Sequence, residues 1–122
     1  METIVRNQGQ IRYAEAYISD MPSLKNIFLQ SQNSSKLNPD FGVPFLLVKK
    51  GNDVLGFASL ILKGSGKISF KIYENSHLSD SEKKNFSLCA ERYFNQNNSG
   101  NFRSTEQLKS SISKMVSWLN AG

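Results

Sequence analysis

The middle of the chain contains three apolar runs separated by short polar turns. Residues 45–48 and 54–62 are apolar at almost every position, which is typical of strands covered on both faces. Residues 67–73 alternate between apolar and polar side chains, as in a strand with one face toward solvent or a cleft. Glycine-containing turns at residues 51–53 and 64–66 join the runs. The pattern predicts an antiparallel three-stranded meander.

A strong helical pattern follows this meander. Ser79 and Glu82 have the spacing of a capping box, in which the two side chains satisfy free amides of the first helical turn. Apolar residues then recur at intervals of three and four, which is the spacing of one helix face. The pattern predicts a helix from Ser79 that ends before Asn95. Its apolar face consists of Phe86, Cys89, Ala90, Tyr93 and Phe94.

Two more helices are predicted, one before the meander and one near the end of the chain. Asp20 is a good N-cap with Pro22 in the first turn, and this helix should fade between residues 30 and 35. Ser104 begins a second capping-box sequence before the last helix. The first helix has an apolar face of Met21, Leu24, Ile27 and Phe28. The last has Leu108, Ile112, Met115, Val116 and Leu119, with Trp118 near the edge of that face.

The remaining segments read as a strand and irregular connections. Residues 11–16 favour a strand through the spacing of their tyrosines, although Ala-Glu-Ala also suits a helix. Residues 1–10 form either a frayed arm or a short extra strand. Residues 38–44 contain two prolines and are predicted to be a connection. These patterns predict one α+β domain over residues 1–122, with an antiparallel sheet of three or four strands packed by three helices.

The composition is that of an ordinary globular protein. The 122 residues are 39% hydrophobic and 20% charged, which fits one compact core better than a disordered or fibrous chain. No apolar run reaches the roughly 18 residues that span a bilayer, and the start of the sequence lacks the apolar block of a signal peptide. The single cysteine, Cys89, has no partner for an internal disulfide. We therefore expect a cytoplasmic protein that does not enter membranes.

The net charge of +5 does not concentrate in a basic patch. The 15 Lys and Arg residues are spread along the sequence, and they are adjacent only at Lys49-Lys50 and Lys83-Lys84. Nucleic-acid-binding proteins gather such residues on one face and interleave aromatic side chains that stack on bases. We therefore do not expect nucleic-acid binding.

The Gly64-Ser65-Gly66-Lys67 sequence has some similarity to a phosphate-binding loop. That motif needs an earlier glycine, where this chain has Ile61, and a Ser or Thr after the lysine, where it has Ile68. A strand also follows this lysine where the motif requires a helix. A hairpin turn is the preferred interpretation.

The end of the third predicted strand holds the best candidates for a site. Tyr73 and Glu74 end this strand, and His77, the only histidine, follows in a loop. A histidine suits a general base, but no activated nucleophile accompanies it, so an exposed loop histidine is the preferred interpretation. Cys89 is expected to pack in the core, and one histidine with one cysteine argues against a zinc site. We assign no catalytic residue and expect no cofactor or metal.

The order of strand, helix, three-stranded meander and helix resembles the N-terminal half of the GCN5-related N-acetyltransferase (GNAT) superfamily. The resemblance rests on residues 11–14 with the following helix, and on residues 45–48 and 51–60, where a Gly-Phe pair follows a polar turn. It covers residues 11 to about 94. The resemblance implies a partial GNAT layout, with coenzyme A or acetyl-CoA as the ligand if the activity is retained.

The loop that holds coenzyme A in that superfamily has no counterpart here. Residues 74–84 contain no glycine, and Asp80 and Glu82 occupy the first helical turn, where they would repel a phosphate. The preferred hypothesis is therefore a non-catalytic GNAT-like domain that acts by binding or by self-association. A homodimer would form through the sheet edge or by helix packing. A divergent acetyl-CoA-dependent acyltransferase or acyl-CoA-binding protein is the alternative, with its ligand beside Tyr73, Glu74 and His77.

Overall fold

The computed structural model of the protein describes residues 10–75 and 78–121. The described chain is an α+β fold, as predicted, with one antiparallel sheet in the order β1-β2-β3-β4. The strands are β1 (Ile11–Glu15), β2 (Val43–Lys50), β3 (Asp53–Leu62) and β4 (Ile68–Glu74). The helices are α2 (Met21–Gln32), α3 (Asp80–Gln96), α4 (Gly100–Arg103) and α5 (Thr105–Ala121), with two short 3-10 helices, η1 (Ile18–Asp20) and η2 (Pro39–Phe41).

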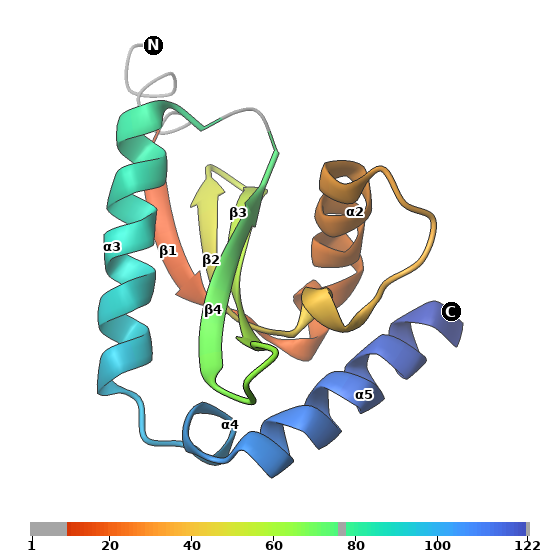
Figure 1. Cartoon of the computed structure of the whole chain (residues 1–122). Coiled ribbons are helices and arrows are strands. Elements are labelled where there is room, and N and C mark those ends of the chain that lie inside the picture. Colours follow the sequence, from red (N-terminus) through yellow and green to blue (C-terminus); the bar gives the residue numbers. More distant parts are fainter. Residues whose placement is uncertain (1–9, 76–77, 122) are drawn as a thin grey trace, which may run out of the picture.

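The sheet lies between helices on both faces (Figure 1). α3 covers one face, α2 covers the other, and α5 runs below α2 toward the C-terminus. Each face has its own cluster of buried side chains, because β2 and β3 carry apolar residues on both faces of the sheet, as predicted. Phe86 and Ala90 of α3 belong to one cluster, and Leu24 and Phe28 of α2 belong to the other.

Hydrogen bonds anchor both ends of α5 to distant parts of the chain. At its start, the Thr105 hydroxyl donates to the carbonyl of Gly66 at 3.0 Å, in the β3–β4 turn. At its end, the Asn120 amide bonds both backbone groups of Leu37, at 2.9 and 3.0 Å, and Lys25 of α2 donates to the carbonyl of Leu119. α5 is therefore held at two points that lie on opposite sides of its middle.

Several element boundaries differ from the sequence prediction. β2 begins at Val43, so the expected connection over residues 38–44 is wrong in its last two residues. Pro44 is tolerated there because the pairing register shifts between Pro44 and Leu46, where the proline has no amide to donate. The short helix α4 was not predicted, since its first residue is a glycine after a polar segment.

Other predictions are confirmed. Within the predicted segment 11–16, residues 11–15 form a strand and not a helix, and the apolar faces of α2, α3 and α5 contribute the buried residues of those helices. The two meander turns lie where they were expected, with Gly51 and Gly66 at positive φ. The choice between a frayed arm and an extra strand for residues 1–10 falls, except for its last residue, outside the described residues.

Candidate functional site

Tyr73 is a core residue on the face of β4 that α2 covers. Its side chain is 7% exposed and packs against Phe28 and Phe57, with ring centroids 5.0 and 5.3 Å away. The hydroxyl donates a hydrogen bond to the backbone carbonyl of Asp40 in η2. Burial, with a smaller contribution from the nearby Asp40 carboxylate, raises the pKa of Tyr73 to about 12. Tyr73 therefore holds β4 against α2 and η2 as a neutral side chain.

Glu74 lies at the end of β4 and contacts α3. Its carboxylate accepts a hydrogen bond from the ammonium group of Lys83 at 2.8 Å. This hydrogen bond, and the charge of Glu74, raise the pKa of Lys83. Successive strand residues point to opposite faces, so Tyr73 and Glu74 lie on different sides of the sheet. The structure does not bring these two side chains together in one cleft.

The start of α3 is occupied by its own capping groups. The Ser79 amide donates to the Glu82 carboxylate at 2.8 Å, and the Glu82 amide donates to the Ser79 hydroxyl at 3.2 Å, which confirms the predicted capping box. The hydrogen bond from the Ser79 amide is the main reason that the pKa of Glu82 is lowered, with Lys50 at 3.6 Å as a further contribution. The helix start is therefore capped and carries the negative charges of Asp80 and Glu82. His77 lies outside the described residues.

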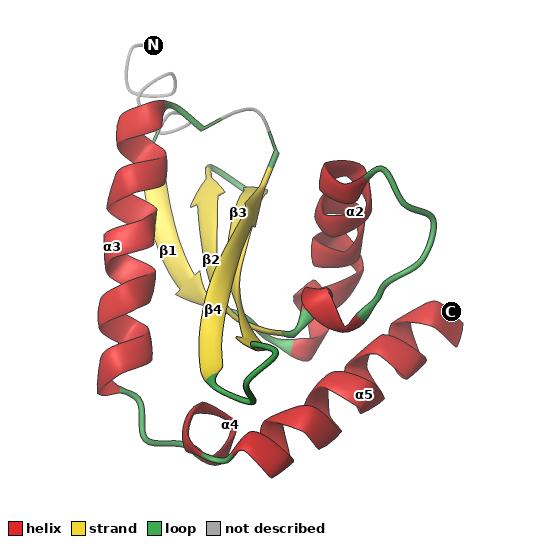
Figure 2. Cartoon of the chain, viewed as in Figure 1, coloured by secondary structure: helices red, strands yellow, loops and turns green. Residues whose placement is uncertain are grey.

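The outer edge of β4 is open within the described part of the chain. β4 is the last strand of the sheet, and Figure 2 shows it in front of the other strands, with no helix crossing in front of it. The Asn75 amide donates to the carbonyl of Leu55, and the Lys63 amide donates to the carbonyl of Lys67, both at 2.9 Å. Antiparallel pairs alternate between bonded and non-bonded residues, so these two bonds define the alternation along β4. The backbone groups that face outward are those of Ile68, Phe70, Ile72 and Glu74.

Apolar side chains accompany these outward-facing backbone groups. Ile68, Phe70 and Ile72 are only partly buried and pack at the border of the cluster beneath α3. Lys71 is exposed between them, on the opposite face of the strand, and forms no ion pair with any described residue. An edge with unpaired backbone groups and apolar side chains can accept another strand, and a central lysine restricts how that strand pairs.

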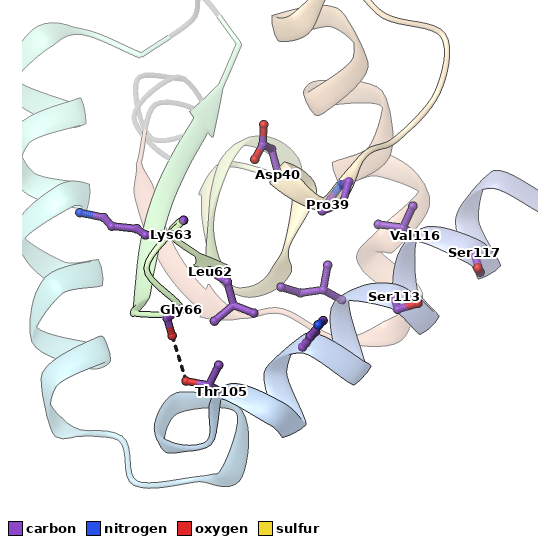
Figure 3. A pocket seen from close by; sticks show the side chains of 12 residues that line it. Pro39, Asp40, Leu62, Lys63, Gly66, Thr105, Ser113, Val116 and Ser117 are labelled. Carbon is purple, nitrogen blue, oxygen red and sulfur yellow. Dashed lines mark hydrogen bonds between the residues drawn. The ribbon is translucent and has the colours of Figure 1, made fainter.

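A groove of about 550 Å³ lies at the other end of β4, between the β3–β4 turn and the middle of α5 (Figure 3). Leu62 lines it from β3, Ile112 and Val116 line it from α5, and Pro39 lines it from η2. The volume falls within the range of about 300–1,000 Å³ that is usual for small-molecule sites. Most of the lining is apolar, and the lining residues Thr105, Ser113 and Ser117 are exposed at its rim.

Three charged residues lie at the rim of this groove. Asp40, Lys63 and Lys109 are exposed, and none forms an ion pair within the described residues. Figure 3 shows the Lys63 side chain extending away from Val116 and Ser113. Lys109, on α5, is the other cation of the lining.

No protein-family model, curated protein or solved structure matches the chain. No described helix is long and apolar enough to cross a membrane. Among residues 10–75 and 78–121, no group of three or more His, Cys, Asp and Glu side chains is arranged to hold a metal ion.

Sequence reasoning named a sheet edge as a dimer surface without identifying the strand that forms it, and it missed the groove. A signal for the edge was present, since the alternating strand is the last of the meander and is followed directly by a helix start. No sequence signal marks the groove, because it depends on how α5 docks against residues far away in the sequence.

Proposed function

We propose that the protein is a non-catalytic binding domain that self-associates through the outer edge of β4, with a second copy of the chain as its partner. The row of outward-facing backbone groups beside Ile68, Phe70 and Ile72 carries this proposal. An added antiparallel strand pairs such groups and covers the apolar side chains next to them. A twofold dimer is also the commonest closed assembly of identical chains.

The side chains of β4 favour one pairing register. With Phe70 opposite the partner's Phe70, Ile68 lies opposite the partner's Ile72, and apolar side chains meet across the interface. Lys71 then faces the partner's Ser69. The two neighbouring registers that also pair outward-facing groups bring Lys71 against the partner's Lys71 or against the partner's Lys67. Like charges directly opposite each other are destabilising, so the Phe70-centred register is preferred.

The acyltransferase alternative draws support from the topology. The antiparallel order of β1 to β4, with α2 after the first strand and α3 after the last, is the order on which the GNAT resemblance rests. The capped and acidic start of α3 speaks against a bound pyrophosphate. Calorimetric titration with coenzyme A and acetyl-CoA separates the two proposals: binding in the micromolar range favours the acyltransferase, and no heat favours the non-catalytic domain.

Sedimentation velocity over a concentration series tests self-association, with Ile72→Pro and Ile72→Ala as a matched pair. Proline removes an outward-facing amide without removing a hydrogen bond to β3, whereas alanine removes much of the side chain and keeps the amide. We expect the alanine variant to dimerise and the proline variant to remain monomeric. A strictly monomeric wild-type protein up to about 1 mM, where weak interfaces already associate, contradicts the proposal.

The compartment is part of the same proposal. Cys89 is a free cysteine, partly buried beside the α3 face of the core. A thiol that stays reduced fits a reducing compartment, so we place the protein in the cytoplasm. Protein recovered from the cytosolic fraction of its source cells supports this assignment, and recovery from a secreted fraction contradicts it.

A further inference from the structure

The geometry points to a second binding site, in which the groove beneath α5 holds a medium-chain fatty acid with its carboxylate near Lys109 and its alkyl chain along Leu62, Ile112 and Val116. This site lies at the opposite end of β4 from Glu74 and is independent of the strand edge. It is also separate from the start of α3, where a GNAT-like protein would hold coenzyme A.

The anchoring of α5 keeps this groove in place. The hydrogen bond from Thr105 to Gly66 joins the helix to the β3–β4 turn, and the bonds between Asn120 and Leu37 join its other end to the segment before η2. The groove lies under the residues between these two anchors, including Ile112 and Val116. Since both ends of the helix are fixed, the groove is a preformed site and not a gap that closes by a small helix movement.

The lining determines the class of ligand. The inner surface is apolar, and the Thr105 hydroxyl at one end is already bonded to the Gly66 carbonyl, so a polar ligand would find few partners there. Lys109 lies one turn from the start of α5, where the helix dipole also favours a negative charge, whereas Asp40 lies at the η2 side. This polarity suits an apolar chain with one anionic end. A nucleotide or another polyanion would need more cations than this groove provides.

Two matched pairs of variants test whether the ligand occupies the groove and whether Lys109 binds its carboxylate, with decanoate and 1-decanol as probes. Ser113→Trp fills the groove, and Ser110→Trp places the same side chain elsewhere on the exposed surface of α5. Lys109→Gln removes the rim charge, and Lys114→Gln removes a lysine of the same helix that does not line the groove. Binding is measured by isothermal titration calorimetry, and the melting temperature is recorded in parallel.

We expect decanoate to bind saturably at one site and to raise the melting temperature. Ser113→Trp should abolish binding, Ser110→Trp and Lys114→Gln should leave it unchanged, and Lys109→Gln should weaken it about two- to fivefold, as for an exposed ion pair. 1-Decanol should bind more weakly than decanoate by a similar factor. Absence of saturable binding, a lowered melting temperature, or Ser113→Trp binding as the wild type overturns the site. Equal affinity for decanoate and 1-decanol overturns the assigned ligand class.

Discussion

A charge introduced at Ser69 should change dimer affinity in a direction that its sign determines. In the Phe70-centred register, Ser69 lies directly opposite the partner's Lys71, and the twofold axis creates this pair twice. Ser69 is half-buried and Lys71 is exposed without an ion pair, so a new side chain has room to meet the ammonium group. Ser69→Glu adds two opposite-charge pairs to the dimer, and Ser69→Lys adds two like-charge pairs.

The size of the effect follows from the value of a cross-strand charge pair. Each pair contributes about 0.2–1 kcal/mol, so two pairs stabilise the Ser69→Glu dimer by about 0.4–2 kcal/mol. This corresponds to a dissociation constant about two- to thirtyfold lower than that of the wild type. Ser69→Lys should raise the constant by a comparable factor. Because both side chains are near solvent, the difference between the variants should shrink as the salt concentration rises.

Sedimentation equilibrium at low and high salt measures these constants, and thermal unfolding in dilute solution checks that both variants fold alike. In the register that places Lys71 opposite the partner's Lys71, Ser69 lies opposite the partner's Tyr73, which is buried in its own chain. Ser69→Glu and Ser69→Lys would then no longer change the dissociation constant in opposite directions. Equal dissociation constants for Ser69→Glu and Ser69→Lys at low salt, or an inverted order, refute the Phe70-centred register. Failure of both variants to associate at any concentration refutes the dimer itself.

Three further predictions concern the fold that supports these sites. Tyr73→Phe should lower the free energy of unfolding by about 0.5–1.5 kcal/mol at neutral pH. The pKa of Tyr73 is raised from 10.0 to about 12, so its neutral hydroxyl stabilises the fold below pH 10 and loses this contribution as the pH rises toward 12. In denaturation series over this pH range, the free energy of unfolding should therefore decline less for the variant than for the wild type. Gly42→Ala should lower the free energy of unfolding by about 1–3 kcal/mol or more, since Gly42 has φ 68° and an added Cβ meets a backbone carbonyl. Gly64 has open space around it, so the control variant Gly64→Ala should have the melting temperature of the wild type. Asn120→Ala should lower the free energy of unfolding, measured by chemical denaturation, by about 1–3 kcal/mol, because it removes both hydrogen bonds to Leu37. An unchanged denaturation midpoint would show that these bonds do not anchor α5.

The local signals in the sequence account for most of the fold. The capping box at Ser79 and Glu82, the glycine turns and the helical apolar faces act over a few residues, and each appears in the structure where it was predicted. Boundaries moved where tertiary contacts matter more than local preference. Pro44 is the clearest case, because a bulge beside it lets an unfavourable residue stand within β2.

The environment of Tyr73 shows why the candidate site was harder to foresee. Its alternating strand suggested a face open to solvent or a cleft, yet α2 covers that face and buries the tyrosine against Phe28. α2 precedes β4 by many residues in the sequence, so the residue pattern of β4 alone does not indicate that α2 covers it. The partly exposed side of β4 is instead the border of the α3 cluster at Phe70.

Amide hydrogen exchange along β4, measured residue by residue over a range of protein concentrations, tests the central proposal most directly. The amides of Ser69, Lys71 and Tyr73 bond to β3 and should be protected at every concentration. The outward-facing amides of Phe70 and Ile72 should exchange rapidly in dilute solution and become protected as the concentration rises. If these two amides stay unprotected at all concentrations, or are already protected in a sample shown to be monomeric, β4 is not the edge through which the protein self-associates.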